Sequence, residues 1–173
     1  IRPDQVGIVE KWWSPRGSLK DNIIALKGEA GYQPDVLRGG IHFRTPLMFR
    51  VRVLPLITIP QGKIGYVFAR DGKQLEPSQV LASNAVAQDF QDVENFLKNG
   101  GQRGPQRRIL REGTYAFNLV QFIVITEERI YTRALSKEEG DTIRGMAEVI
   151  AQRGGFRPVV IKDTDDSIGI VTV

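Results

Sequence analysis

Short runs of alternating apolar and polar residues predict strands at three places in the chain. Residues 5–9 (Gln-Val-Gly-Ile-Val), 63–67 (Lys-Ile-Gly-Tyr-Val) and 167–171 (Ser-Ile-Gly-Ile-Val) share one pattern of polar, β-branched, glycine, apolar and valine. Each run follows a turn-like lead-in, which is typical of a strand that begins at a turn. The recurrence of one pattern indicates an internal repeat.

Two segments have the periodicity of a helix instead. In the first, Val93, Phe96 and Leu97 fall at helical spacing before the stop signal Asn99-Gly100. The second runs from about 137 to 152 after Ser136, an N-cap residue with Glu139 three positions later. Its apolar face consists of Ile143, Met146, Ala147, Ile150 and Ala151, and Gly154-Gly155 end it. Because the rest is strand or turn, we predict an α+β fold of tandem small antiparallel-sheet modules with short helices.

A longer repeated phrase sets the module boundaries. Residues 31–42 and 104–115 share the skeleton Gly-x-Gln-x-x-β-branched-Leu-Arg-x-Gly-x-aromatic, and each copy precedes an aromatic-rich apolar stretch, residues 43–59 and 117–126. Agreement at so many positions in one order indicates duplication. We therefore predict a first module over residues 1–58, a second over 59–135, and a truncated third over 136–173 that holds a helix and an opening strand.

Composition removes several classes of chemistry. The 173 residues include no cysteine and one histidine, His42, and their net charge is +4. Without cysteine there is no disulfide, thiolate zinc site, iron–sulfur cluster or cysteine nucleophile. Asp163, Asp165 and Asp166 lack the ligand spacing of a calcium loop and predict a solvated turn. We predict no catalytic residue, no cofactor and no metal site, and interpret His42 as a packed, hydrogen-bonded ring.

Three stretches together resemble the stomatin/prohibitin/flotillin superfamily (SPFH, or band 7), most closely its bacterial flotillin-like branch. They are residues 59–65 (Ile-Pro-Gln-Gly-Lys-Ile-Gly), the turn 69–72 (Ala-Arg-Asp-Gly) and residues 100–115, which contain the second copy of the phrase. The resemblance covers essentially the whole chain. It implies SPFH-type modules from the membrane-proximal part of a non-enzymatic scaffold protein, which organises membrane microdomains and assembles into large rings or cages.

The same resemblance implies an N-terminal anchor and a C-terminal coiled coil, and neither is present in the 173 residues. We take both ends of the chain as cut points in a longer protein. No run approaches the roughly 20 apolar residues of a spanning helix. The expectation is therefore a soluble fragment of a membrane-associated protein, whose partners are membrane lipids, further copies of itself and a membrane-protein client.

Two sets of residues are candidates for contacts with those partners. Trp12 and Trp13 follow the first strand, and neighbouring side chains on a strand point to opposite faces, so one core cannot bury both. Together with Leu47, Met48 and Phe49, which lie between Arg44 and Arg50, they are candidates for membrane contact or for burial against the sheet or a neighbouring subunit.

The second set is basic: Arg103, Arg107, Arg108 and Arg111. These arginines could meet anionic headgroups, or pair with acids of a neighbouring module or subunit. Arg38 and Arg111 share a repeat position, which favours a structural role for that pair in clamping turn carbonyls.

Two further functions remain open from the sequence. One is a regulatory binding module that docks a membrane protease or another partner. The other is a basic nucleic-acid-binding domain, which the small charge excess and the lack of aromatic residues among the arginines disfavour, so no nucleic acid is expected.

Overall fold

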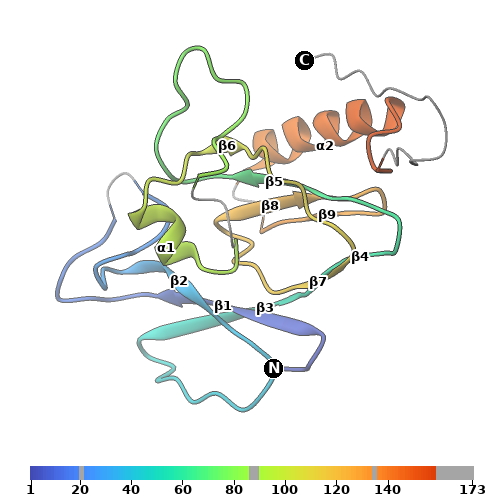
Figure 1. The fold of residues 1–173 in the computed structure, drawn as a ribbon. Helices are drawn as coiled ribbons and strands as arrows, with labels where there is room; N and C mark the ends of the chain where they lie inside the picture. The colour runs from blue at the N-terminus through green and yellow to red at the C-terminus, as the bar shows by residue number, and fades with distance from the viewer. Residues whose placement is uncertain (20–21, 86–89, 134–135, 159–173) are drawn as a thin grey trace, which may run out of the picture.

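A computed structural model describes residues 1–19, 22–85, 90–133 and 136–158, with nine strands and two helices within these ranges. Figure 1 shows the order of the elements along the chain. They are β1 (Gln5–Lys11), β2 (Gly31–Leu37), β3 (Phe49–Pro55), β4 (Ile57–Ile59), β5 (Tyr66–Ala69), α1 (Val93–Lys98), β6 (Gly104–Pro105), β7 (Gly113–Tyr115), β8 (Phe122–Ile125), β9 (Ile130–Tyr131) and α2 (Lys137–Gln152). The predicted small α+β fold is confirmed, and the predicted strand at 167–171 lies outside the described residues.

The first sheet is antiparallel and has the order β2-β1-β3. Gly7 in the central strand pairs with Leu37 on one side and with Val53 on the other. A Cβ atom on Gly7 would lie 2.5 Å from Cδ1 of Ile1 and 3.2 Å from Cβ of Leu37. A side chain here would require Ile1 and Leu37 to shift, so close packing favours glycine.

The second sheet repeats this arrangement in the order β6-β5-β8-β9, again antiparallel. Gly65, directly before β5, forms a bridge with Leu110, and a Cβ atom on Gly65 would lie 2.9 Å from Cδ1 of Ile59. Leu110 and Leu37 occupy the same position of the repeated phrase. Gly7 and Gly65 are thus equivalent, as the sequence predicts.

The repeated phrase also makes the same hydrogen bonds in both copies. The side-chain amide nitrogen of Gln33 donates to the backbone carbonyls of Glu29 and Gly31, at 3.2 and 3.0 Å. That of Gln106 donates to the carbonyls of Gln102 and Gly104, at 2.8 and 2.9 Å. The shared glutamine of the phrase therefore has the same task in both copies, which is to bind backbone carbonyls.

The turns at the end of the phrase match as well. Gly40 and Gly113 have φ angles of 141° and 143°, a region that favours glycine. Gly40 exchanges hydrogen bonds with Ile1, whereas Gly113 pairs with Ile59 in the two-stranded sheet β4-β7. The predicted boundary between residues 58 and 59 falls within β4.

One hydrophobic cluster draws its residues from both sheets. Ile8, Ile24 and Ile57 of the first copy pack with Val67 and the aromatic side chains of the second. The rings of Phe90, Phe96, Phe117 and Phe122 contact one another, with centroids 5.2 to 6.2 Å apart. α1 contributes Phe96 and Val93, so the helix predicted here is confirmed and helps to close this core.

Two polar side chains join the copies. The carboxylate of Asp71 accepts hydrogen bonds from the backbone N–H groups of Ile23 and Ile24, and the amide of Asn118 donates to the carbonyls of Gln33 and Pro34. Because Asn118 is fully buried, these bonds satisfy a polar group that would otherwise destabilise the core. The two copies therefore pack as one body.

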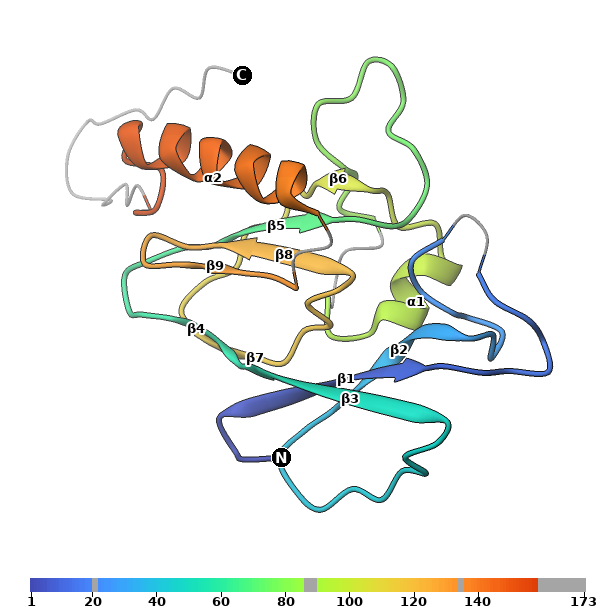
Figure 2. The same ribbon diagram turned by 180° about the vertical axis from the view of Figure 1, so that it is seen from behind.

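α2 covers the second sheet, as Figure 2 shows from behind. Ser136 caps it by accepting from the N–H of Glu139, and Ile143 is buried with Met146 and Ile150 packed beside it, as predicted. The Glu139 carboxylate pairs with Arg70, whose almost fully buried guanidinium also donates to the carbonyls of Leu119, Val120 and Arg133. Arg70 thus connects the helix to the loops around β8.

Candidate functional site

The segment between the first repeated phrase and β3 is unusually exposed for its composition. Within residues 41–48, here called the apolar loop, Ile41 is fully exposed, Phe43 is 94% exposed and Leu47 is 89% exposed. Figures 1 and 2 both show this loop at the end of the molecule opposite α2, beside the N-terminus. Large apolar side chains gathered on one surface are typical of a protein or membrane contact.

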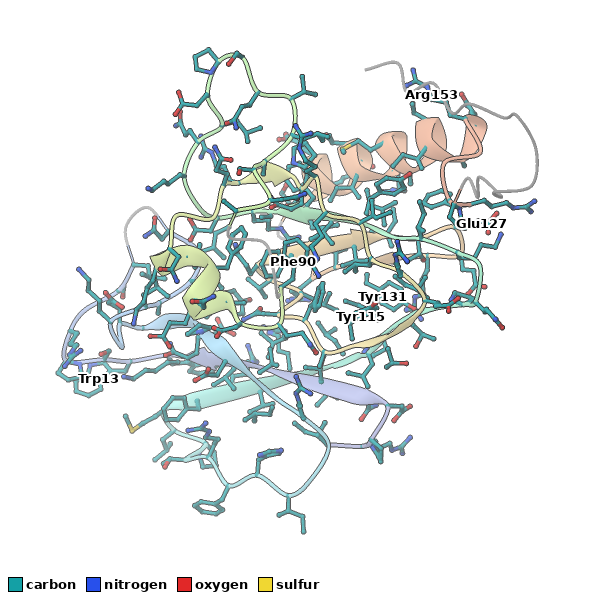
Figure 3. All side chains as sticks on the ribbon, viewed as in Figure 1. Trp13, Phe90, Tyr115, Glu127, Tyr131 and Arg153 are labelled. Carbon is teal, nitrogen blue, oxygen red and sulfur yellow. The ribbon has the colours of Figure 1, made fainter. Side chains whose placement is uncertain are left out.

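Trp12 and Trp13 lie beside the apolar loop at the end of β1. They are 59% and 62% exposed, and the N–H of Trp12 donates to the carbonyl of Met48 at 2.9 Å. Figure 3 shows Trp13 at the edge of the molecule, on the side of the first sheet. The prediction that one core cannot bury both indoles agrees with this arrangement.

Met48 and Phe49 are half-buried at the base of the loop, so the two alternatives left by the sequence, membrane contact and burial, both stay open for them. The guanidinium of Arg44 lies 5.6 Å from the centre of the Phe49 ring, and that of Arg50 lies 5.0 Å from the Trp12 ring. Ile41 and Phe43, which the sequence interpretation did not name, are exposed. The apolar surface therefore carries cations at its rim.

The basic stretch is divided by the fold. Arg107, Arg108 and Arg111 are exposed and line one hollow of about 690 Å³. Arg103 lines a different hollow of about 390 Å³, beside Phe68 and Leu75. Arg103 therefore lines a hollow of its own, and a contact of these arginines with headgroups or a subunit stays a prediction.

The prediction that the side chains of Arg38 and Arg111 clamp turn carbonyls is wrong. Arg38 donates to the Gln91 side chain instead, and the Arg111 side chain is exposed in the hollow. What the two positions share is the backbone carbonyl. His42 Nε2 lies 2.6 Å from the carbonyl oxygen of Arg38, and the Tyr115 hydroxyl donates to that of Arg111 at 2.9 Å.

His42 is therefore hydrogen-bonded as predicted, but its ring is exposed and not packed. In the part of the chain that the structure describes, no three His, Cys, Asp or Glu side chains gather as metal ligands would. None of the described helices is long and apolar enough to span a bilayer. The Asp163, Asp165 and Asp166 turn lies outside the described residues.

Comparison of the chain with protein-family models, with curated proteins and with solved structures gives no match.

Proposed function

We propose that this chain is a non-enzymatic scaffold module of a flotillin-like protein, and that it rests on a membrane surface through the apolar loop and Trp12-Trp13. The observation that carries the proposal is the exposure of Phe43 and Leu47 beside two exposed indoles, with Arg44 and Arg50 at the rim. Indoles are favoured at headgroup depth, and arginines near an anionic surface each contribute about 1 kcal/mol.

The magnitudes predict weak binding by a single module. Full burial of a large apolar side chain contributes about 1.5–3 kcal/mol, and a side chain at an interface is buried only in part. Binding should therefore favour anionic over neutral vesicles and decline with salt. In the full-length scaffold, many copies of the module would act together, so that weak single contacts add up.

Further copies of the chain are the second proposed partner, and a membrane-protein client is the third. Ile1 is hydrogen-bonded to Gly40, so a segment joined before Ile1 would leave the fold beside the apolar loop. If that segment is the membrane anchor of the proposed scaffold, it would hold the apolar loop at the membrane. We expect residues 1–173 alone to be monomeric or weakly associated, with full rings requiring a coiled coil.

Binding to phosphatidylcholine–phosphatidylserine vesicles tests the membrane contact. Trp12 and Trp13 are the only tryptophans, so intrinsic fluorescence and its quenching by brominated lipid report on this surface alone. The double variant Phe43→Ser/Leu47→Ser should lose most vesicle binding while both reporters remain. Val80→Ser is the matched control, because Val80 is 79% exposed and lies outside the loop.

Unchanged binding and quenching in the Phe43→Ser/Leu47→Ser variant would contradict the proposal. If the wild-type chain does not bind vesicles but forms dimers, and the variant does not form them, the apolar loop is a contact between copies. If it binds a membrane protein through the loop and no lipid, the regulatory-module alternative takes the place of the scaffold.

A further inference from the structure

The hollow lined by Arg107, Arg108 and Arg111 concentrates positive charge without an acid to balance it. Its described lining contains no Asp or Glu. Within the described ranges none of the three guanidinium groups forms an ion pair, whereas Lys63, Arg70, Lys98 and Arg144 each pair with a carboxylate. Like charges that line one hollow repel, so a bound anion would stabilise the folded chain.

The one carboxylate of this loop is directed elsewhere. Glu112 lies between Arg111 and β7, yet its Oε2 accepts a hydrogen bond at 3.0 Å from the N–H of Gly62 in the turn before β5. The nearest acid in sequence is therefore engaged on another element and leaves the hollow basic.

Cations and apolar walls meet at this site. Arg38 reaches toward the hollow from the first copy, donating at 3.1 Å to the Oε1 atom of Gln91, a lining residue. Phe90 and Tyr115, which Figure 3 labels, also line the hollow. The hollow therefore presents guanidinium groups and aromatic surface together, and its guanidinium groups are accessible to a ligand from solvent.

We infer that this hollow binds a phosphate-bearing anion, held by Arg107, Arg108 and Arg111. Planar guanidinium groups pair with phosphate oxygens through two parallel hydrogen bonds, which lysine cannot reproduce. The phosphate can belong to a soluble molecule or to a phosphomonoester lipid headgroup, and both present the same oxygens. The inference goes beyond the proposed function, because a soluble phosphate would bind here without any membrane contact.

The experiment titrates pyrophosphate into residues 1–173 by calorimetry at low salt, and separately measures binding to vesicles of four parts phosphatidylcholine to one part phosphatidic acid. Arg108→Gln and Arg111→Gln should each weaken binding about tenfold or more, since each removes charge-assisted hydrogen bonds. Arg103→Gln is the matched control: it removes the same charge from the same stretch but lines another hollow. Thermal unfolding verifies that each variant is folded.

A soluble source predicts pyrophosphate binding, and a lipid source predicts vesicle binding that needs phosphatidic acid and the same arginines. Retention of pyrophosphate binding in the Phe43→Ser/Leu47→Ser variant would separate this site from the membrane contact. Equal losses in all three arginine variants would show only diffuse charge attraction and overturn the inference. So would the absence of both kinds of binding, or arginine variants that change the oligomeric state and leave anion binding intact.

Discussion

Residues 42–49 and 115–122 have the same length and the same turn, yet they meet opposite environments. In the first segment the carbonyl of Thr45 accepts from the N–H groups of Met48 and Phe49, and in the second that of Asn118 accepts from Gln121 and Phe122. Leu47 is 89% exposed, whereas Val120, its counterpart, is completely buried. The same turn of the backbone is therefore exposed in the first copy and buried in the second.

The side chains of the two segments follow this difference. Phe117 contacts Phe122 with ring centroids 5.9 Å apart, inside the aromatic core. At the same two positions of the first copy, the Arg44 guanidinium lies 5.6 Å from the centre of the Phe49 ring. The first segment thus has a ring at its base, Phe49, as the second does. Where the second copy has Phe117, the first has the Arg44 cation, which water solvates well.

The neighbour of each segment explains its burial. The second segment packs on the first copy, where the Asn118 amide donates to two carbonyls of β2. No sheet in the described part of the chain packs on the apolar loop, whereas β2 packs on its counterpart. Burial of this segment therefore depends on a neighbouring surface, and a membrane is the neighbour that we propose for the first copy.

The largest expected effect comes from placing one charge at the two equivalent positions. Val120→Asp puts an unpaired carboxylate in the core, which costs several kcal/mol, and should prevent folding. Leu47→Asp should change the free energy of unfolding by no more than about 0.5 kcal/mol, as for an ordinary surface position. Thermal unfolding monitored by circular dichroism compares them.

Similar destabilisation by both aspartates would break the comparison. It would mean that Leu47 is covered in solution, and sedimentation of the wild-type chain would then reveal the second copy that covers it.

The duplication could be predicted from sequence because its repeated residues have backbone tasks. Gln33 and Gln106 each bind two carbonyls, and Gly40 and Gly113 adopt the same positive φ, so substitutions at these positions are costly in both copies. The helix ending at Gln152 was equally predictable, because its cap and its apolar face are local features.

The exposure of the apolar loop was not predictable in the same way. Phe43 and Leu47 follow a copy of the phrase just as Phe117 and Val120 do, and apolar composition does not say which neighbour will cover it. Arg103 could not be separated from Arg107 either, since its hollow is formed with residues 68–75, far away in sequence. For both features the sequence pattern is local. The exposure of the loop and the hollow that Arg103 lines depend on long-range packing.

A moderate effect should sharpen the backbone half of the comparison. Gly40→Ala and Gly113→Ala should each destabilise the chain by about 1–3 kcal/mol, because alanine rarely adopts the φ of 141° or 143° found there. The nearest side-chain atoms are 3.7 and 3.4 Å from the added Cβ, so conformational strain and not a clash causes the loss. Urea unfolding measures both variants.

Gly145→Ala is the control for these substitutions. Gly145 lies inside α2 with open space around its Cβ position, so alanine should stabilise the chain by up to about 1 kcal/mol. A large loss at Gly113 with none at Gly40 would show that the two turns are equivalent in shape but not in energetic weight.

The smallest expected effect concerns α2, which covers the second sheet and has no counterpart among the described elements of the first. The Tyr66 hydroxyl donates to the carbonyl of Gly155, just beyond α2, and burial raises the pKa of this phenol above its ordinary value. A raised pKa in the folded state means that the folded chain holds the phenolic proton more tightly than the unfolded chain. The resulting stability is fully present below the ordinary tyrosine pKa and is lost as the pH rises through the folded pKa.

Urea unfolding of the wild type and of Tyr66→Phe across the alkaline range tests this expectation. Lysines deprotonate in both proteins, so the difference between the two stabilities isolates the phenol. At neutral pH, Tyr66→Phe should lose the hydrogen bond to Gly155, about 0.5–1.5 kcal/mol. The gap should narrow as the pH rises, because the wild type alone loses the contribution of its protonated phenol. A gap that stays constant or widens would show that the phenol is not held protonated by the docking of α2, and that the cover over the second sheet is hydrophobic in origin alone.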